Sequence, residues 1–190
     1  MKHTRTNNSR ASMRTKSPSL KRDVENLRKL YEEDLKDIYW AEKHLMKALQ
    51  KMVKASSSDE LKRAFENHMD RTKTQITRLE KVFHASDLKV AGKRCEGIEG
   101  ITKEAEDVIE EFNKGSVCDA GLIIAAQKAE HYEIASYGSL RSLAHTLEFE
   151  EASKLLQETL EEEGEADKML TTLSEKINTQ AYSQSEMPSM

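Results

Sequence analysis

Apolar residues recur along this chain at alternating steps of three and four, which is typical of long helices that bury one face. The pattern predicts four long helices, at residues 23–54, 58–85, 117–147 and 149–177, and a short one at 102–112. In the first, the apolar row is Leu27, Tyr31, Ile38, Ala41, Leu45, Ala48, Met52 and Ala55. Ser57, followed three residues later by Glu60, has the spacing of a capping box that starts the second helix.

The segment between the second and third long helices is long and contains Gly92, Gly97, Gly100 and Gly115. It is expected to cross the bundle and to contain the short helix. Two helical hairpins joined by a long crossover is the connectivity of ferritin-like bundles. The predicted fold is therefore an all-α, ferritin-like four-helix bundle, although a plain four-helix scaffold has the same pattern.

Composition supports one helical domain. The 190 residues include only seven Gly and two Pro, the residues that weaken or end helices. Residues 1–22 hold seven of the 30 basic residues and no acid, so the rest of the chain is acidic. We expect a disordered basic tail over 1–22, the bundle over 23–180 and a frayed end over 181–190.

The basic tail and the lack of long apolar runs indicate which partners the protein has and where in the cell it is found. A basic tail can attract nucleic acid or another acidic partner, but without interleaved aromatic residues this signal is weak and a solubilising extension is favoured. Neither a secretory signal nor a run of eighteen apolar residues is visible, which favours a soluble cytoplasmic protein without membrane association. Cys95 and Cys118 lack the spacing of a metal finger and are expected to be free thiols.

Polar residues interrupt the apolar row of every long helix. A buried carboxylate is costly unless it is paired, hydrogen-bonded or bound to a cation. Counting from each hairpin turn puts Glu130 level with Glu163 and Asp37 level with Gln75, so the polar groups are expected to meet in one layer. The candidate residues are Asp34 and Asp37, His68 and Gln75, Glu130 and Glu133, and Glu163 and Asp167.

Carboxylates with one or two histidines suit iron or manganese, and a carboxylate can bridge two such ions. We therefore expect a metal site that holds one ion or a pair. The competing interpretation is that these acids edge the apolar rows and reach solvent or basic partners. His131 follows Glu130 directly but points about 100° away on a helix, so it is expected at the surface.

Four segments carry a resemblance to a known family: DLKDIYWAEKHLMKAL, HMDRTKTQITRLEKVF, DAGLIIAAQKAEHYEIASYGSLRSLA and LLQETLEEEGEADKMLTTL. Over about residues 24–178 the chain resembles the YciE/YciF family of ferritin-like, stress-associated bacterial proteins, which is similar to the rubrerythrins. The resemblance implies that Glu130, Glu133 and Glu163 are metal ligands, with Asp167 in or near a ligand position. It also aligns Asp34 with Glu130 and Asp37 with Glu133, as in a degenerate repeat.

The second helix departs from the family pattern, because Arg71 stands where an acid is expected, with Gln75 one turn later. Arginine stays protonated and cannot ligate a cation. Either Asp70 or His68 compensates, or the second metal position is lost.

Two functions follow from these alternatives. One is redox chemistry at a di-iron-type site, as in ferroxidases or peroxidases. The other is a metal-free structural or interaction protein of the stress response, in which Arg71 neutralises the acids. A homodimer is expected in either case.

Overall fold

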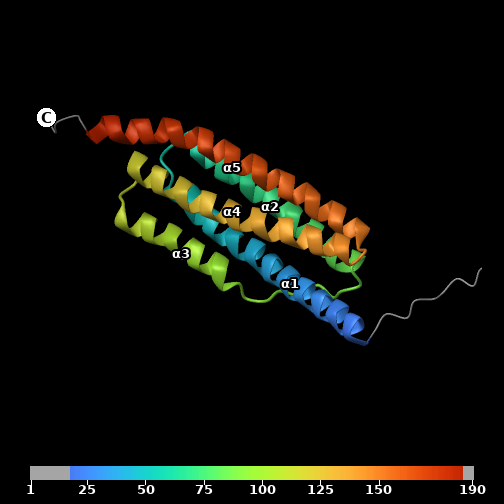
Figure 1. Cartoon of the computed structure of the whole chain (residues 1–190). Coiled ribbons are helices and arrows are strands. Elements are labelled where there is room, and N and C mark those ends of the chain that lie inside the picture. Colours follow the sequence, from blue (N-terminus) through green and yellow to red (C-terminus); the bar gives the residue numbers. More distant parts are fainter. Residues whose placement is uncertain (1–17, 186–190) are drawn as a thin grey trace, which may run out of the picture.

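The computed structural model describes residues 18–185 of the chain, and the regular structure in that range is entirely helical. The helices are α1 (Pro18–Ala55), α2 (Asp59–Ala85), α3 (Glu96–Glu111), α4 (Ser116–Thr146) and α5 (Glu150–Ser185). Helices α1 and α2 form one antiparallel hairpin and α4 and α5 form another (Figure 1). The four pack side by side, which confirms the predicted all-α, ferritin-like bundle.

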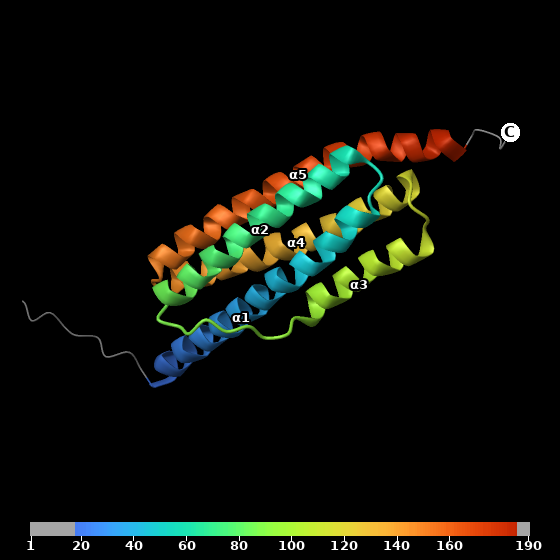
Figure 2. The same ribbon diagram turned by 180° about the vertical axis from the view of Figure 1, so that it is seen from behind.

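The crossover occupies one side of the bundle. It leaves α2, runs along α1, and leads into α3, which lies beside α1 and α4 (Figure 2). The backbone N–H of Lys93 donates to the carbonyl of Lys36 at 3.0 Å, and Gly92 lies against the side chain of Trp40. The far end of α5 extends beyond the other helices (Figure 1).

Two helix starts differ from the predictions because side chains cap them locally. Ser58, and not Ser57, caps α2, since its hydroxyl accepts from the N–H of Leu61 at 3.3 Å. The carboxylate of the buried Asp119 in α4 accepts from the N–H groups of Ser57 and Ser58, at 2.7 and 2.8 Å. Helix α3 begins at Glu96, well before residue 102, because the thiol of Cys95 caps its first turn.

The outer ends of the bundle also differ from the predicted boundaries. Helix α1 begins at Pro18. Proline suits the first turn, because the backbone N–H that it lacks would have no partner within the helix at that position. Helix α5 continues to Ser185, beyond the expected frayed end at residue 181. Residues 1–17, which make up most of the predicted basic tail, lie outside the described residues, as do residues 186–190.

The core is mainly apolar towards both ends of the bundle, where the buried polar residues include Ser56, Ser86 and Asp119, and it is most polar in the middle. Tyr31, Leu35, Phe83 and Leu61 are fully buried. Cys95 and Cys118 are buried and free, as predicted. Among the described residues, no helix is long and apolar enough to cross a membrane. The homodimer and the partners of the tail stay predictions.

Candidate metal centre

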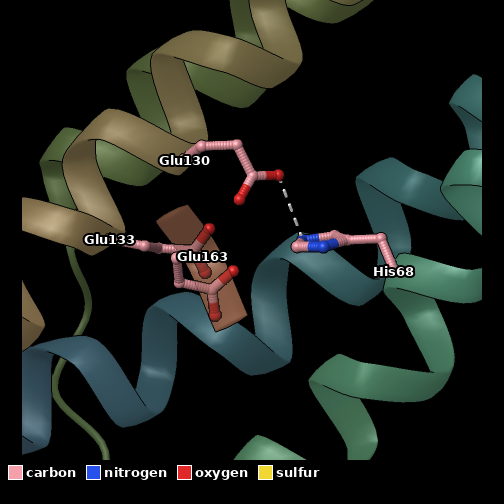
Figure 3. A group of neighbouring side chains, drawn as sticks. All are labelled: His68, Glu130, Glu133 and Glu163. Carbon is pink, nitrogen blue, oxygen red and sulfur yellow. Dashed lines mark ion pairs between the residues drawn. The ribbon is translucent and has the colours of Figure 1, made fainter. Parts of the chain in front are cut away.

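Four buried side chains from three helices meet in the middle of the bundle: His68 of α2, Glu130 and Glu133 of α4, and Glu163 of α5 (Figure 3). One potential ligand atom from each lies within 4.8 Å of all the others. None of the four side chains is more than 5% exposed. We call this group the central cluster.

Helical spacing explains how the cluster forms. Glu130 and Glu133 are three residues apart, so they project from one face of α4. Glu163 comes from the antiparallel α5, at nearly the same distance from the hairpin turn, as the sequence predicted. His68 faces them from α2, with its Nε2 atom 3.4 Å from Oε1 of Glu130 (Figure 3).

The ring of His68 is in the form that can bind a metal. Burial, together with the charge of Arg71, lowers the pKa of His68 to about 4. The imidazole is therefore neutral at neutral pH, and its contact with Glu130 is not an ion pair there. Neutral imidazole is the form in which histidine is a metal ligand.

The carboxyl groups repel one another and are removed from water. Burial is the main cause that raises the pKa of Glu130 and Glu133 well above the ordinary range, and neighbouring carboxylates add to it. Burial also raises the pKa of Glu163 to about 7. Without a cation, these groups tend to keep their protons at neutral pH.

Several buried polar atoms at the cluster have no hydrogen-bond partner. They are both ring nitrogens of His68, Oε1 of Gln75 and the Oε2 atoms of Glu42, Glu130, Glu133 and Glu163. An unsatisfied buried polar atom costs roughly 1–3 kcal/mol, and an isolated charge costs more. A divalent cation would satisfy several of these atoms together, so the donor set fits a metal of the iron or manganese type.

Glu42 of α1 is a fully buried acid that the sequence analysis missed. It accepts a hydrogen bond from the hydroxyl of Tyr137. Burial and the charge of Glu163 raise the pKa of Glu42 to about 8. A clear signal was present in the sequence, since position 42 is the one polar member of the regular row Tyr31, Leu35, Ile38, Glu42, Leu45, Leu49 and Met52.

Gln75 lies beside the cluster, as expected, and is fully buried. Its side-chain amide donates to Oε1 of Glu163 at 2.6 Å and to Oε2 of Glu162 at 3.0 Å. The first of these bonds holds the carboxylate of Glu163 in place, and the second links Gln75 to Glu162. The amide oxygen of Gln75 remains without a hydrogen-bond partner.

The predicted neutralisation of the cluster by direct hydrogen bonds from Arg71 is wrong. Arg71 is 40% exposed, and its recorded partners are the carboxylate of Glu165 at 3.8 Å and the backbone oxygen of Glu162 at 3.5 Å. Its position on α2 directs the guanidinium towards the surface of α5. The charge of Arg71 still lowers the pKa of Glu163, but as one of the smaller causes.

The arginine that forms buried hydrogen bonds next to the cluster is Arg78, a residue that was not predicted from the sequence. Its side chain is 13% exposed and forms two hydrogen bonds of 2.8 Å with Glu162. It also donates to Thr159 at 2.8 Å and lies 3.3 Å from Glu158. Arg78 therefore fastens α2 to α5 next to the cluster.

Three of the predicted acids do not join the cluster. Asp34 is exposed, and Asp37 accepts from the hydroxyl of Tyr132 at 2.9 Å. The reason is rotational: Leu35 and Ile38 face the core, and their neighbours in sequence point about 100° away. Asp167 is half-buried beside Gln127 and the exposed His131, at 3.2 and 3.3 Å. The expected surface position of His131 is confirmed.

Comparison with known proteins decides the family. A family model described as "Domain of unknown function (DUF892)" matches residues 26–183, most of the chain. This chain belongs to the DUF892 family. One relative, Protein YciF of Escherichia coli K12, is 49% identical to this chain over 141 residues. The match covers 74% of this chain and 85% of YciF. The predicted resemblance to the YciE/YciF proteins is confirmed.

Solved structures agree with the DUF892 assignment. The crystal structure of the E. coli stress protein YciF has 45% identity and a TM-score of 0.78, over 80% of this chain and 97% of YciF. YcfI from Rhodopseudomonas palustris, described provisionally as a structural protein, has 36% identity and a TM-score of 0.76, over 80% and 96% of the two chains. A Xanthomonas campestris protein, 19% identical with a TM-score of 0.67 over 85% and 99%, shares the fold.

Proposed function

We propose that the central cluster binds divalent metal ions of the iron or manganese type and that this DUF892 protein uses them in redox chemistry. The observation that supports the proposal best is the set of buried carboxylate and imidazole atoms without hydrogen-bond partners. Such atoms are costly to bury, and they converge from three helices on one small volume. The relative named as a stress protein is compatible with a role of this kind.

In this proposal the residues divide the work between holding metal and orienting ligands. Glu130, Glu133, Glu163 and His68 would hold the first ion, and Glu42 would bring a further carboxylate for a second one. Gln75 and Tyr137 orient two of these carboxylates by hydrogen bonds. Hydrogen bonds of this kind fix the orientation of the ligands and tune the properties of the metal.

Bound iron would supply the electrons. Two Fe(II) ions, one dioxygen molecule and two protons would give two Fe(III) ions and one hydrogen peroxide molecule. Binding of iron would displace the protons that the buried carboxyl groups of Glu163 and Glu42 tend to keep in the metal-free protein. The apolar surroundings keep bulk water away from the reaction.

A metal-free function is the second candidate, and one observation favours it. Tyr137 and Gln75 already donate hydrogen bonds to the acids, and raised pKa values allow the carboxyl groups to stay protonated. The cluster would then be a neutral polar layer in a structural protein, the description that YcfI carries. Metal analysis separates the two candidates.

The test compares wild-type protein with Glu163→Gln and with Glu161→Gln, a matched change at an exposed position of α5. We expect wild type and Glu161→Gln to bind Mn(II) tightly in calorimetry and to oxidise Fe(II) in air. Glu163→Gln is expected to bind Mn(II) at least about 10–100-fold more weakly, because losing even a group that only orients a ligand costs that much. Equal affinity in all three proteins would contradict the proposal.

A further inference from the structure

A small apolar cavity adjoins the central cluster on the side of His68 and Glu130. Both of these residues line it. The remaining wall is mainly aliphatic and includes six alanines: Ala64, Ala105, Ala125, Ala126, Ala129 and Ala166. Their short side chains, from α2, α3, α4 and α5, leave the space open.

The size of the cavity limits what it can hold. Its volume is about 20 Å³, counted as the space open to the centre of a water-sized sphere. One water molecule needs about 10–15 Å³ by that measure. The cavity therefore has room for one diatomic molecule, and an organic substrate would not fit.

Its lining selects for apolar molecules. Among its wall residues, the unsatisfied polar atoms belong to His68 and Glu130, at the cluster end. The hydroxyl of Thr102 is already engaged with the carbonyl of Glu99 and with His44, each at 3.1 Å. Apolar cavities stay dry and accept uncharged gases, whereas a hydrated ion would lose its solvation.

The outer wall of the cavity is the side chain of Met169. This residue of α5 is 37% exposed, and it also lines a groove on the surface between α2 and α5, together with Asn67 and Arg71. Met169 is the exposed residue of the cavity wall, and the cavity and this groove share it. Methionine has three rotatable bonds, so it can move aside at little cost.

We propose that this alanine-lined cavity is the passage by which dioxygen reaches the central cluster, with Met169 as its outer gate. The inference rests on the proposed redox function and adds to it the route by which dioxygen arrives. A hydrated metal ion needs another way in. The apolar residues of the passage then control the rate at which dioxygen arrives and leave the affinity for metal unchanged.

The first experiment uses metal-free protein and dioxygen itself. Dioxygen is paramagnetic, so under oxygen pressure it increases the NMR relaxation of methyl groups that it approaches. We expect stronger relaxation at the cavity methyls of Ala129 and Ala166 than at the equally buried methyls of Ala41 and Ala144. Equal relaxation at all four would overturn the passage, whether or not the protein binds metal.

The second experiment fills the cavity. Ala126→Val adds two methyl groups at its wall, and Ala144→Val makes the same change at a buried position of α4 outside it. We expect Ala126→Val to lose the relaxation at Ala129 and to oxidise bound Fe(II) several-fold more slowly at low dioxygen. Mn(II) affinity should match wild type in both variants. Unchanged oxidation by Ala126→Val would count against the passage.

The gate gives an independent test in case overpacking unfolds Ala126→Val. Because Met169 is partly exposed, both Met169→Phe and Met169→Ala should fold. We expect oxidation at low dioxygen to slow in Met169→Phe and to accelerate in Met169→Ala, with Mn(II) affinity unchanged. Identical rates would overturn the gate, and failure of wild type to bind any metal would overturn the proposed function instead.

Discussion

At the scale of single residues, the decisive feature is that several carboxyl groups share one dry volume. Burial alone disfavours their ionised forms, and each charge that forms makes the next less favourable. The result is that Glu163 and Glu42 have pKa values of about 7 and about 8, and burial also raises the pKa values of Glu130 and Glu133 well above the ordinary range. In the unfolded chain each would titrate near the ordinary value, about 4.3.

A dependence of stability on pH follows for the metal-free protein. Between pH 6.5 and 8 the folded state keeps protons that the unfolded state has already released, so its free energy of unfolding falls as pH rises. Each retained proton contributes a slope of about 1.4 kcal/mol per pH unit. His68, with its lowered pKa, has the opposite effect, but only below about pH 6.5, where unfolded histidine becomes protonated.

Urea unfolding at intervals between pH 6.5 and 8, in the presence of a chelator, measures this slope. We expect Glu163→Gln to flatten it, because an amide has no proton to release. Glu161→Gln should keep the wild-type slope, since its carboxylate is exposed. A wild-type stability that stays level or rises over this interval would show that the carboxyl groups are ionised in the folded protein.

At the scale of helices, the sequence was a good guide to the elements and a partial guide to their faces. The long helices were predictable because each has a sustained apolar row. Two apolar rows can be drawn along α1, and they differ in which residues are taken to face the core. Asp34 interrupts one row and Glu42 the other, and the row with Asp34 was chosen. Helix rotation decides between them, and the more regular row, which runs from Tyr31 through Glu42 to Met52, is the one that faces the core.

The contact between α2 and α5 could not be predicted from the sequence for a similar reason. Arg71 and Arg78 lie two turns apart on α2 and look equivalent in a helical pattern. Only the packed helices show that Arg78 meets the carboxylate of Glu162 in a paired arrangement, while Arg71 reaches the exposed Glu165. Paired hydrogen bonds from arginine to a carboxylate are stronger than a single exposed ion pair.

The two arginines therefore predict different costs for the same substitution. Arg78→Met should lower the free energy of unfolding by about 1–3 kcal/mol, since it removes two hydrogen bonds to the charged Glu162, which then keeps only the amide of Gln75. Arg71→Met should change it by less than about 0.5 kcal/mol, as for other surface positions. Denaturant unfolding of both variants near pH 7 checks this, and equal losses would mean that the Arg78 contacts add nothing to the packing of α2 on α5.

At the scale of the whole molecule, the bundle buries a layer of carboxyl groups between two mainly apolar ends, and burying that layer opposes folding. The apolar layers at each end must offset the polar layer, and a bound cation would relieve that cost. Anything that binds the folded state alone stabilises it, by about 2.7 kcal/mol when its concentration is a hundred times its Kd. Metal should thus act on global stability and not on one helix.

Because the ligands must lose protons to bind metal, this stabilisation should grow with pH. Metal-free protein becomes less stable from pH 6.5 to 8, whereas the affinity for Mn(II) rises as the carboxyl groups ionise. The gap in unfolding free energy between protein with excess Mn(II) and protein with chelator should therefore widen over this interval. Adding Mn(II) to weakly buffered protein at pH 6.5 should also release protons. A gap that is the same at both pH values, or that persists in a Glu130→Gln Glu163→Gln double variant, would mean that Mn(II) binds elsewhere.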